Sequence, residues 1–267
     1  MKLLQYLMAG ALVMGALSAH AEIISGISGV ADEDLQGMDW KSRVGVQGLY
    51  VPKFSGANNY EWRAFPLIDI QWHDTLFLNS MRGVGAQFNP INNVHVGAAI
   101  NYDWGRDDSD DRHLNGLGDV DGSFEGGVFA AYQLADWRIE ADVYRALQEK
   151  GYDGVHGKVG LANVQRFIDD RLILTVAGHA SFADDNYMKA YYGVTPLQSY
   201  NSGLRAYTPD SGFYKVGANV TAGFGLTRLW AINMVVGYNR LIEDAGNSPV
   251  VQDVDQYRFG VGSSFRF

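Results

Sequence analysis

The residues best suited to chemistry form an acidic run, Asp107 to Asp111, followed by Asp119 and Asp121. Several carboxylate oxygens close together are the ligands that Ca²⁺ prefers. The run lacks the spacing and the bidentate glutamate of an EF-hand loop, and acidic runs are commonly solvated. We therefore predict no specific metal site and no cofactor, and expect only loose binding of divalent ions.

Histidine and serine residues raise the question of catalysis. His179 and Ser181 are two residues apart and so share one face of a strand, and Asp103 is expected on the same side of the sheet. A Ser-His-acid triad also needs its base oriented by a third group, and no spacing here indicates one. His95 and His156 lie on other segments, without the spacing of a metal site. We predict neither catalytic residues nor an enzyme.

The elements that must position these residues are strands of alternating polarity. The clearest covers residues 229–241, and 94–104, 137–144 and 213–224 repeat its pattern. Segments of about ten residues with one apolar face are typical of tilted transmembrane strands. Aromatic residues at their ends would form the two interfacial girdles: Trp104, Trp137, Trp230 and Tyr238.

The last eleven residues carry the same pattern. Tyr257, Phe259, Phe265 and Phe267 fall on one face, and Arg258 is among the residues on the other. The machinery that assembles outer-membrane barrels reads such a terminal aromatic. We therefore predict a lipid-facing closing strand, with the four aromatic residues as the barrel-assembly signal.

The start of the chain predicts export. Lys2 precedes an apolar run from Leu3 to Leu17, and Ala19-His-Ala21 is a small-residue cleavage site. These are the parts of a secretory signal peptide, so we expect a signal peptide at 1–21, a periplasmic amino-terminal segment at 22–41 and a barrel at 42–267. No other segment approaches the ~20 apolar residues of a membrane helix.

Composition narrows the function classes. The chain has no cysteine, which excludes disulfides and thiolate metal sites. Its net charge of −9 disfavours nucleic acid as a partner, because the phosphates would be repelled. A mean hydropathy of −0.13 suits a barrel with polar inward positions and an apolar surface in the outer membrane.

We predict an all-β fold, a transmembrane antiparallel up-and-down β-barrel. Twelve strands give the best account: 42–51, 61–71, 75–80, 83–88, 94–105, 123–134, 136–147, 154–165, 170–182, 212–224, 228–240 and 255–267. Their connections alternate between short and long, as periplasmic turns and extracellular loops do. Two segments within 75–88 are too short to span a bilayer, so a ten-strand barrel is the alternative.

Many inward positions of this barrel are ionisable, with both signs of charge. Buried charges need partners, so we expect a self-neutralising network in the lumen; the alternative is the lining of a selective pore. The network would comprise Arg63, Asp69, Asp103, Glu125, Arg138, Glu140, Asp142, Lys158, Lys215 and Arg258.

The long connection at 184–211 is the candidate surface loop. It is rich in tyrosine and carries an arginine, which is typical of binding surfaces. The equally supported alternative is a loop that folds over the mouth of the barrel. The candidate residues are Tyr191, Tyr192, Tyr200, Arg205 and Tyr207.

Four segments together resemble the MipA/OmpV family of outer-membrane proteins. They are Trp62 to Trp72, Arg82-Gly-Val-Gly85, Asn101-Tyr-Asp-Trp-Gly-Arg106 and the closing Tyr257 to Phe267. The resemblance implies a non-enzymatic barrel, and for the best-known member a scaffold that brings a lytic transglycosylase together with a murein synthase. The family has no catalytic motif to carry over to this chain.

Three functions follow as hypotheses. The first is a non-catalytic scaffold for enzymes that synthesise and remodel murein (peptidoglycan), acting from the periplasmic side of the outer membrane. The second is a narrow channel for small solutes, and the third is a surface adhesin or receptor. The expected partners are outer-membrane lipid, lipopolysaccharide and the barrel-assembly machinery, with the two murein enzymes added under the first hypothesis.

Overall fold

The structure is a computed structural model that describes residues 40–148 and 151–267. The expected signal peptide and all but the last two residues of the expected segment 22–41 lie outside the described residues, so both stay predictions.

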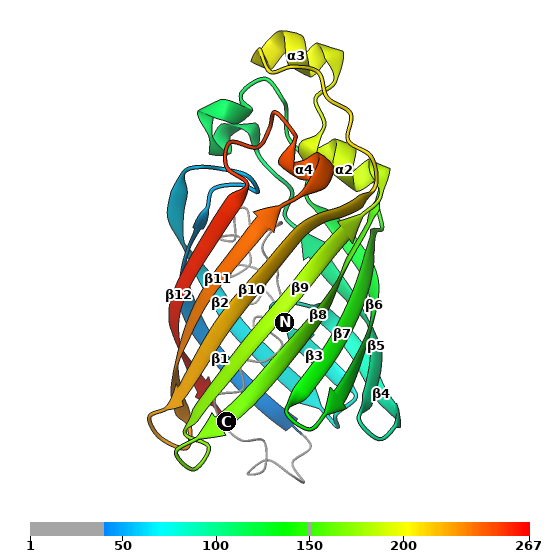
Figure 1. Cartoon of the computed structure of the whole chain (residues 1–267). Coiled ribbons are helices and arrows are strands. Elements are labelled where there is room, and N and C mark those ends of the chain that lie inside the picture. Colours follow the sequence, from blue (N-terminus) through cyan, green and yellow to red (C-terminus); the bar gives the residue numbers. More distant parts are fainter. Residues whose placement is uncertain (1–39, 149–150) are drawn as a thin grey trace, which may run out of the picture.

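Twelve strands form one closed antiparallel barrel (Figure 1). Each strand pairs with the next along the chain, and β1 pairs with β12 to close the ring. This confirms the predicted fold and twelve strands rather than ten. The strands are β1 (Trp40–Pro52), β2 (Tyr60–Trp72), β3 (Leu76–Asn79), β4 (Gly83–Ile91), β5 (Val94–Asp103), β6 (Ser123–Leu134), β7 (Trp137–Ala146), β8 (Val155–Phe167), β9 (Leu172–Ala183), β10 (Gly212–Gly225), β11 (Trp230–Leu241) and β12 (Asp255–Arg266).

The side chains alternate as the sequence predicts. Along β12, Tyr257 and Phe265 are exposed on the outer face, while Arg258 and Arg266 are buried on the inner face. β11 alternates in the same way over its whole length. The outer face is therefore apolar and suits lipid, and the polar residues line the lumen.

The strand connections differ in length at the two ends of the barrel. The connections at 73–75, 92–93, 135–136, 168–171 and 226–229 are short, whereas those at 53–59, 104–122, 147–154, 184–211 and 242–254 are long. Short turns face the periplasm in barrels of this kind. The long connections, drawn above the strands in Figure 1, are therefore extracellular.

β3 is the exception among the strands because it has only four residues. The chain reverses at residues 80–82, where Asn79 Oδ1 accepts hydrogen bonds from the backbone N–H groups of Met81 and Arg82. Gly83 follows with φ +84°, and a Cβ there would lie 2.0 Å from the carbonyl oxygen of Ile100. The turn therefore ends β3 partway up the barrel wall.

The extracellular connections contain short helices that the strand pattern does not predict. α2 (Asp185–Tyr192) begins at Asp184, whose carboxylate accepts from Tyr187 N at 2.9 Å. α3 (Pro196–Ser202) has a capping box with Thr195 and ends at Gly203 in the left-handed conformation. α4 (Glu243–Gly246) and two 3-10 helices (Asp108–Asp110, Arg112–Leu114) complete this end.

Candidate functional site

The centre of the lumen holds an ion-pair group around Glu140 on β7. Arg138 Nε lies 3.0 Å from Glu140 Oε2, and the Arg82 guanidinium bonds to the other carboxylate oxygen. The same guanidinium lies over the ring of Phe129, 4.3 Å from its centroid. Strand alternation does not predict Arg82 as a lumen residue, because Arg82 sits in a turn between two short strands and is assigned to neither face.

A second lumen pair lies one inward position further along β7. Lys158 Nζ is 3.5 Å from Asp142 Oδ2, and the two residues are directly opposite across β7 and β8. Both carboxylates are buried, with side-chain exposures of 6% for Glu140 and 7% for Asp142. Opposite charges thus meet at adjacent levels of the lumen, as a self-neutralising network requires.

The upper lumen contains two buried carboxylates under α2. Glu125 accepts hydrogen bonds from the Tyr152 hydroxyl and from His156 Nε2, the latter at 2.8 Å. Asp103 Oδ1 accepts from the Tyr191 hydroxyl at 2.8 Å. These contacts tie the barrel wall to the extracellular segments that cover it.

The other predicted network residues have separate surroundings. Arg63 pairs with Glu61 at 2.5 Å and donates to the carbonyl oxygen of Lys53. Asp69 is exposed near the periplasmic end and accepts from Asn79 Nδ2 at 3.3 Å. Lys215 and Arg258 are buried on the inner faces of β10 and β12.

α2 forms the centre of a packed cap at the extracellular mouth. Its buried Tyr187, Met188, Tyr191 and Tyr192 contact residues from several connections and strand ends. The partners in this cluster are Val120, Ala146, Tyr152, Ala183, Tyr214, Leu241 and Ala245. For Tyr191 and Tyr192 the structure agrees with the second alternative, a loop folded over the mouth of the barrel: both are buried, because α2 turns them toward the barrel.

A second apolar cluster extends the cap across the mouth. Phe54 and Ala57 come from the β1–β2 connection, and Leu114 and Leu117 come from the β5–β6 connection. They pack with Val194, which follows α2, and with residues of the β11–β12 connection, among them Val250. All five long connections, with Tyr152 representing β7–β8, thus contribute buried side chains to the cap.

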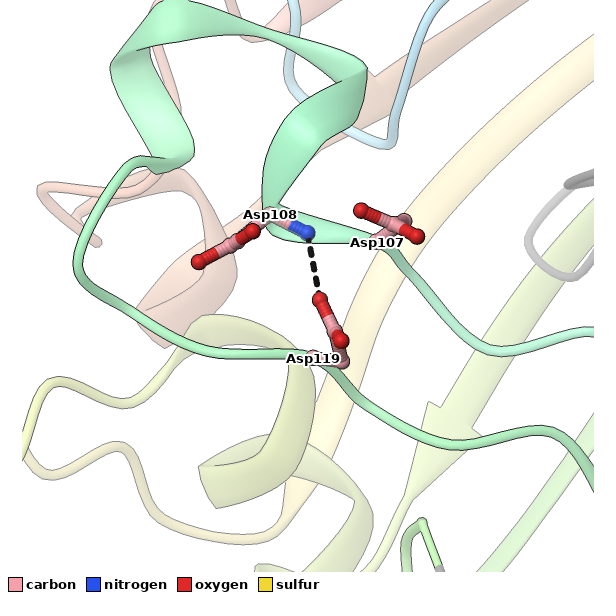
Figure 2. Close-up of side chains that lie close together, drawn as sticks. All are labelled: Asp107, Asp108 and Asp119. Atoms are coloured by element: carbon pink, nitrogen blue, oxygen red, sulfur yellow. Dashed lines mark hydrogen bonds between the residues drawn. The ribbon is translucent and has the colours of Figure 1, made fainter.

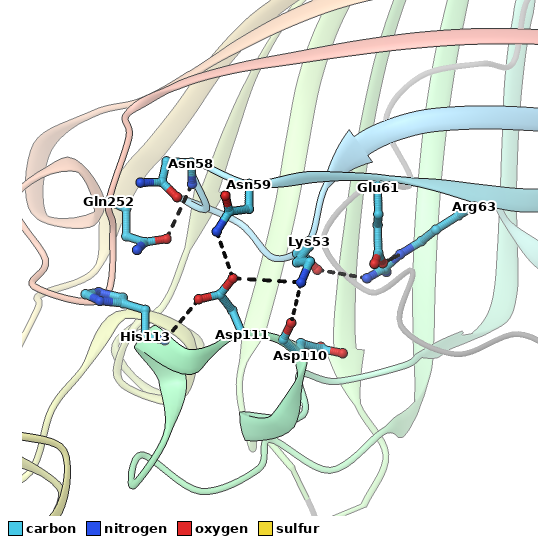
Figure 3. A network of polar contacts seen from close by, with 9 residues as sticks. All are labelled: Lys53, Asn58, Asn59, Glu61, Arg63, Asp110, Asp111, His113 and Gln252. Carbon is cyan, nitrogen blue, oxygen red and sulfur yellow. Dashed lines mark hydrogen bonds and ion pairs between the residues drawn. The ribbon is translucent and has the colours of Figure 1, made fainter.

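Polar contacts join the β1–β2 and β5–β6 connections at the edge of the cap (Figure 3). Asn59 Nδ2 donates to Asp111 Oδ2 at 3.1 Å, and Lys53 Nζ lies 4.0 Å from the same oxygen. The backbone N–H of His113 donates to Asp111 and holds the pKa of that carboxyl below its usual value. Burial instead raises the pKa of Asp110.

The predicted acidic run brings three carboxylates together (Figure 2). One oxygen each of Asp107, Asp108 and Asp119 lies within 4.8 Å of the others. Asp119 Oδ1 accepts from the backbone N–H of Asp108 at 2.8 Å, and Asp107 accepts from Ser109 N at 2.8 Å. Hydrogen bonding from the Ser109 side chain, and then from its backbone N–H, lowers the pKa of Asp107. These hydrogen bonds give two of the carboxylates a role in shaping the loop.

The remaining predicted loop residues stay near the surface. Tyr200 on α3 is 87% exposed. Arg205 lies over the ring of Tyr207 and donates to the carbonyl oxygen of Asn247 at 2.7 Å. The four aromatic residues of the predicted assembly signal, Tyr257, Phe259, Phe265 and Phe267, are exposed on the outer face; their role in assembly stays a prediction.

None of the helices in the described ranges, 40–148 and 151–267, is long and apolar enough to cross a membrane.

Comparisons with known proteins agree with this architecture. The YiaT proteins of Escherichia coli K12 and O157:H7, named provisionally as outer membrane proteins, are each 27% identical over 161 residues. The match covers 60% of this chain and 63% of each relative, so the chain spans less than two thirds of their length. Among solved structures, the NanC porin superposes with a TM-score of 0.50 at 10% identity, covering 84% of this chain and all of NanC.

The family comparison covers most of the chain. Residues 44–267 match the model of the family described as MltA-interacting protein MipA. With a closed barrel, a porin-like fold and outer-membrane relatives, the chain belongs to the MipA family of outer-membrane β-barrels.

Proposed function

We propose that this protein is a non-catalytic scaffold that holds murein-remodelling enzymes, a lytic transglycosylase among them, at the periplasmic face of the outer membrane. The observation that carries the proposal is the extracellular cap. Its two apolar clusters join all five long connections, so a solute moving along the barrel axis would have to displace buried side chains. A barrel whose mouth is closed by a cap is better suited to anchoring partners at the membrane than to conducting solutes.

The family description supports the choice of partner. It names an interaction with MltA for the family, and a lytic transglycosylase acts on murein, which lies on the periplasmic side. A partner there would meet the short turns. The turn at 168–171 is the best candidate, because Ile168 is 61% exposed and has φ +57°, which is unusual for a β-branched residue. Strained, exposed apolar residues are often kept for a function.

The lumen contacts support the same conclusion. Glu140 pairs with two arginines and Asp142 pairs with Lys158, so these inward charges neutralise one another. A pore that selects ions would instead present rings of one charge to the solute.

The test is binding of the purified barrel in lipid nanodiscs to a purified lytic transglycosylase. The scaffold predicts saturable binding that an unrelated outer-membrane barrel does not show. The variant I168A/D169K should weaken it at least tenfold, whereas the matched variant L197A/Y200A on the extracellular α3 should not. Deleting 22–39 asks whether that segment contributes. No binding above the unrelated barrel would refute the proposal.

One observation favours a second candidate, an extracellular contact surface. α3 buries none of its residues, and Leu197 and Tyr200 are exposed at 69% and 87%. Figure 1 shows α3 farthest from the barrel. Adhesion of whole cells that falls with L197A/Y200A but not with I168A/D169K would favour this function over the scaffold.

A further inference from the structure

The strand pairing of the barrel wall is interrupted between β2 and β5. β3 pairs only with residues 69–72 of β2, and β4 pairs with β5 only up to Ile100. Above this level no strand of the described chain lies between the two, and β2 and β5 do not pair with each other. We call this interruption the β2–β5 window.

The upper edge of β2 presents to the window backbone groups that no strand in residues 40–148 and 151–267 pairs with. Ile68 faces β3, because its N–H donates to Ser80 Oγ at 2.6 Å and its carbonyl accepts from Ser80 N at 2.9 Å. Backbone groups alternate sides along a strand, so those of Pro66, Ala64 and Trp62 point the same way. No strand of the described ranges pairs with them there. Pro66 has no N–H to leave unsatisfied, as expected at a strand edge.

The window is closed above and below. Its upper border is the contact of Asn59 and Lys53 with Asp111, which joins the two flanking connections (Figure 3). Its lower border is the turn at 80–82, which ends β3. The window is therefore a bounded gap in the wall and not a split that runs to the end of the barrel.

The window lies at membrane depth. Trp62 and Trp72 are exposed on the outer face of β2, ten positions apart, which matches the height of the apolar band between two aromatic girdles. Ala64 and Pro66 lie between them. Val84 and Ile100, which pair with each other at the lower end of the window, are 60% and 55% exposed on the lipid-facing surface. The window is thus continuous with the surface that contacts lipid.

The inner side of the window is apolar. Leu67, Met81 and Trp104 are partly buried and pack against a lumen cluster of Leu49, Val51, Phe65 and Val235. Trp104 follows the end of β5 at Asp103, and its indole packs against this cluster and against the ring of Tyr102, with 4.7 Å between the ring centroids; a place in the girdle stays a prediction. An apolar surface therefore lies on the lumen side of the window, whose other side faces hydrocarbon.

We propose that the β2–β5 window binds one acyl chain of an outer-leaflet lipid, which enters sideways from the membrane. Polarity along the window matches the orientation of such a lipid. Trp62 and Ala64, toward the extracellular interface, offer to the polar end N–H and carbonyl groups that no described strand pairs with on this side. Below them Pro66 offers no donor, and Leu67 and Met81 offer apolar contact to the chain.

A strand from a second copy is the competing occupant, because an open strand edge can pair with another. Pro66 opposes it by interrupting the row of donors in the middle of the edge. A lipid does not need a continuous row of backbone hydrogen bonds, so Pro66 does not prevent lipid binding.

The test uses the full barrel reconstituted in phosphatidylcholine vesicles that contain a lipid with a diazirine midway along its acyl chain. After irradiation, mass spectrometry locates the adducts. The proposal predicts adducts on the partly buried Leu67, Met81 or Trp104, as well as on the lipid-facing Ile100. The matched control is Thr221, buried on the inner face of β10 between fully paired strands, which should carry none.

Two variants complete the test. Met81→Glu places a charge in the window and should lower the adducts on Trp104 at least tenfold while leaving those on Ile100 unchanged. Ala64→Cys, in a chain without natural cysteine, reports on pairing between copies. Adducts confined to outward-facing residues, equal labelling of Thr221 and Trp104, or a disulfide-linked A64C dimer would each overturn the proposal.

Discussion

Met188 is the residue whose truncation should open the cap without changing the barrel. It is 1% exposed and lies on α2 within the larger apolar cluster of the cap. Met188→Ala removes a buried side chain that the surrounding connections hold in place. Truncations of this kind cost about 2 to 5 kcal/mol, because the contacts are lost and the cavity refills only partly. The strands keep their pairing, so the loss should fall on the cap.

The expected loss of cap stability determines which assay can detect it. A loss of about 2 kcal/mol raises the population of the opened cap by about 30-fold. Limited proteolysis of the barrel in vesicles, with cleavage followed within 184–211, measures that population when opening is fast relative to cleavage. We expect about a 30-fold or larger increase in the cleavage rate for M188A, and higher single-barrel conductance in planar bilayers.

The matched control lies on the same connection. Leu197→Ala truncates an apolar side chain that is 69% exposed on α3, and exposed substitutions usually change stability by less than about 0.5 kcal/mol. Equal cleavage rates for M188A and L197A would refute the reasoning, because burial in the cap would then have no energetic consequence. Unchanged conductance with faster cleavage would show that the lumen is closed by something other than the cap.

Three further predictions test the lumen and the cap. Glu140→Gln should destabilise the barrel by about 3 to 5 kcal/mol in urea unfolding, since two arginines lose a buried partner, whereas the exposed Asp136→Asn should cost little. Asp111 has a lowered pKa in the folded protein, so its contribution to the stability of the cap is present above about pH 4 and is lost as the pH falls through the folded pKa. As the pH falls through this range, protection of the cap from an acid-active protease should decline more steeply in the wild type than in D111N. Gly56→Ala should increase cap proteolysis more than Gly203→Ala: both have positive φ, which costs about 1 to 2 kcal/mol, but only at Gly56 would the Cβ also lie 2.7 Å from Val251. Equal effects of the two glycine changes would remove packing around Gly56 from the explanation.

Strand alternation is the part of this protein that sequence predicts well. A strand that faces lipid on one side and a polar lumen on the other must alternate, so the pattern fixes both its place and the orientation of residues such as Glu140 and Lys158. Their partners are harder to predict, because pairing depends on register. Arg82 illustrates the limit: it reaches Glu140 from a turn, where no periodicity applies.

For a different reason, the sequence could not decide whether the connection at 184–211 is a binding surface or a loop folded over the mouth of the barrel. Tyr191 and Tyr192 lie in a connection whose composition resembles a binding surface, and local sequence does not separate an aromatic residue that faces solvent from one packed against other loops. The buried positions arise from contacts with segments distant in the chain, such as Tyr214 and Ala245. The start of α3 is easier to predict from local sequence than the burial of these tyrosines, because Thr195, Pro196 and Gln198 together are typical of a helix start.

The cap and the β2–β5 window share one structural border, so a change at this border should affect both. The contacts of Asp111 with Asn59 and Lys53 hold the edge of the cap and also close the window from above. Met188 lies in the other apolar cluster, centred on α2 and without members from the β1–β2 connection. Loosening the cap through Met188 should therefore leave acyl-chain labelling at Trp104 unchanged. Asp111→Asn removes the charge at the shared border, so it should raise both the cleavage of the cap and the labelling of Trp104. If M188A raised the labelling of Trp104 as much as D111N does, the border at Asp111 would have no specific effect on the window.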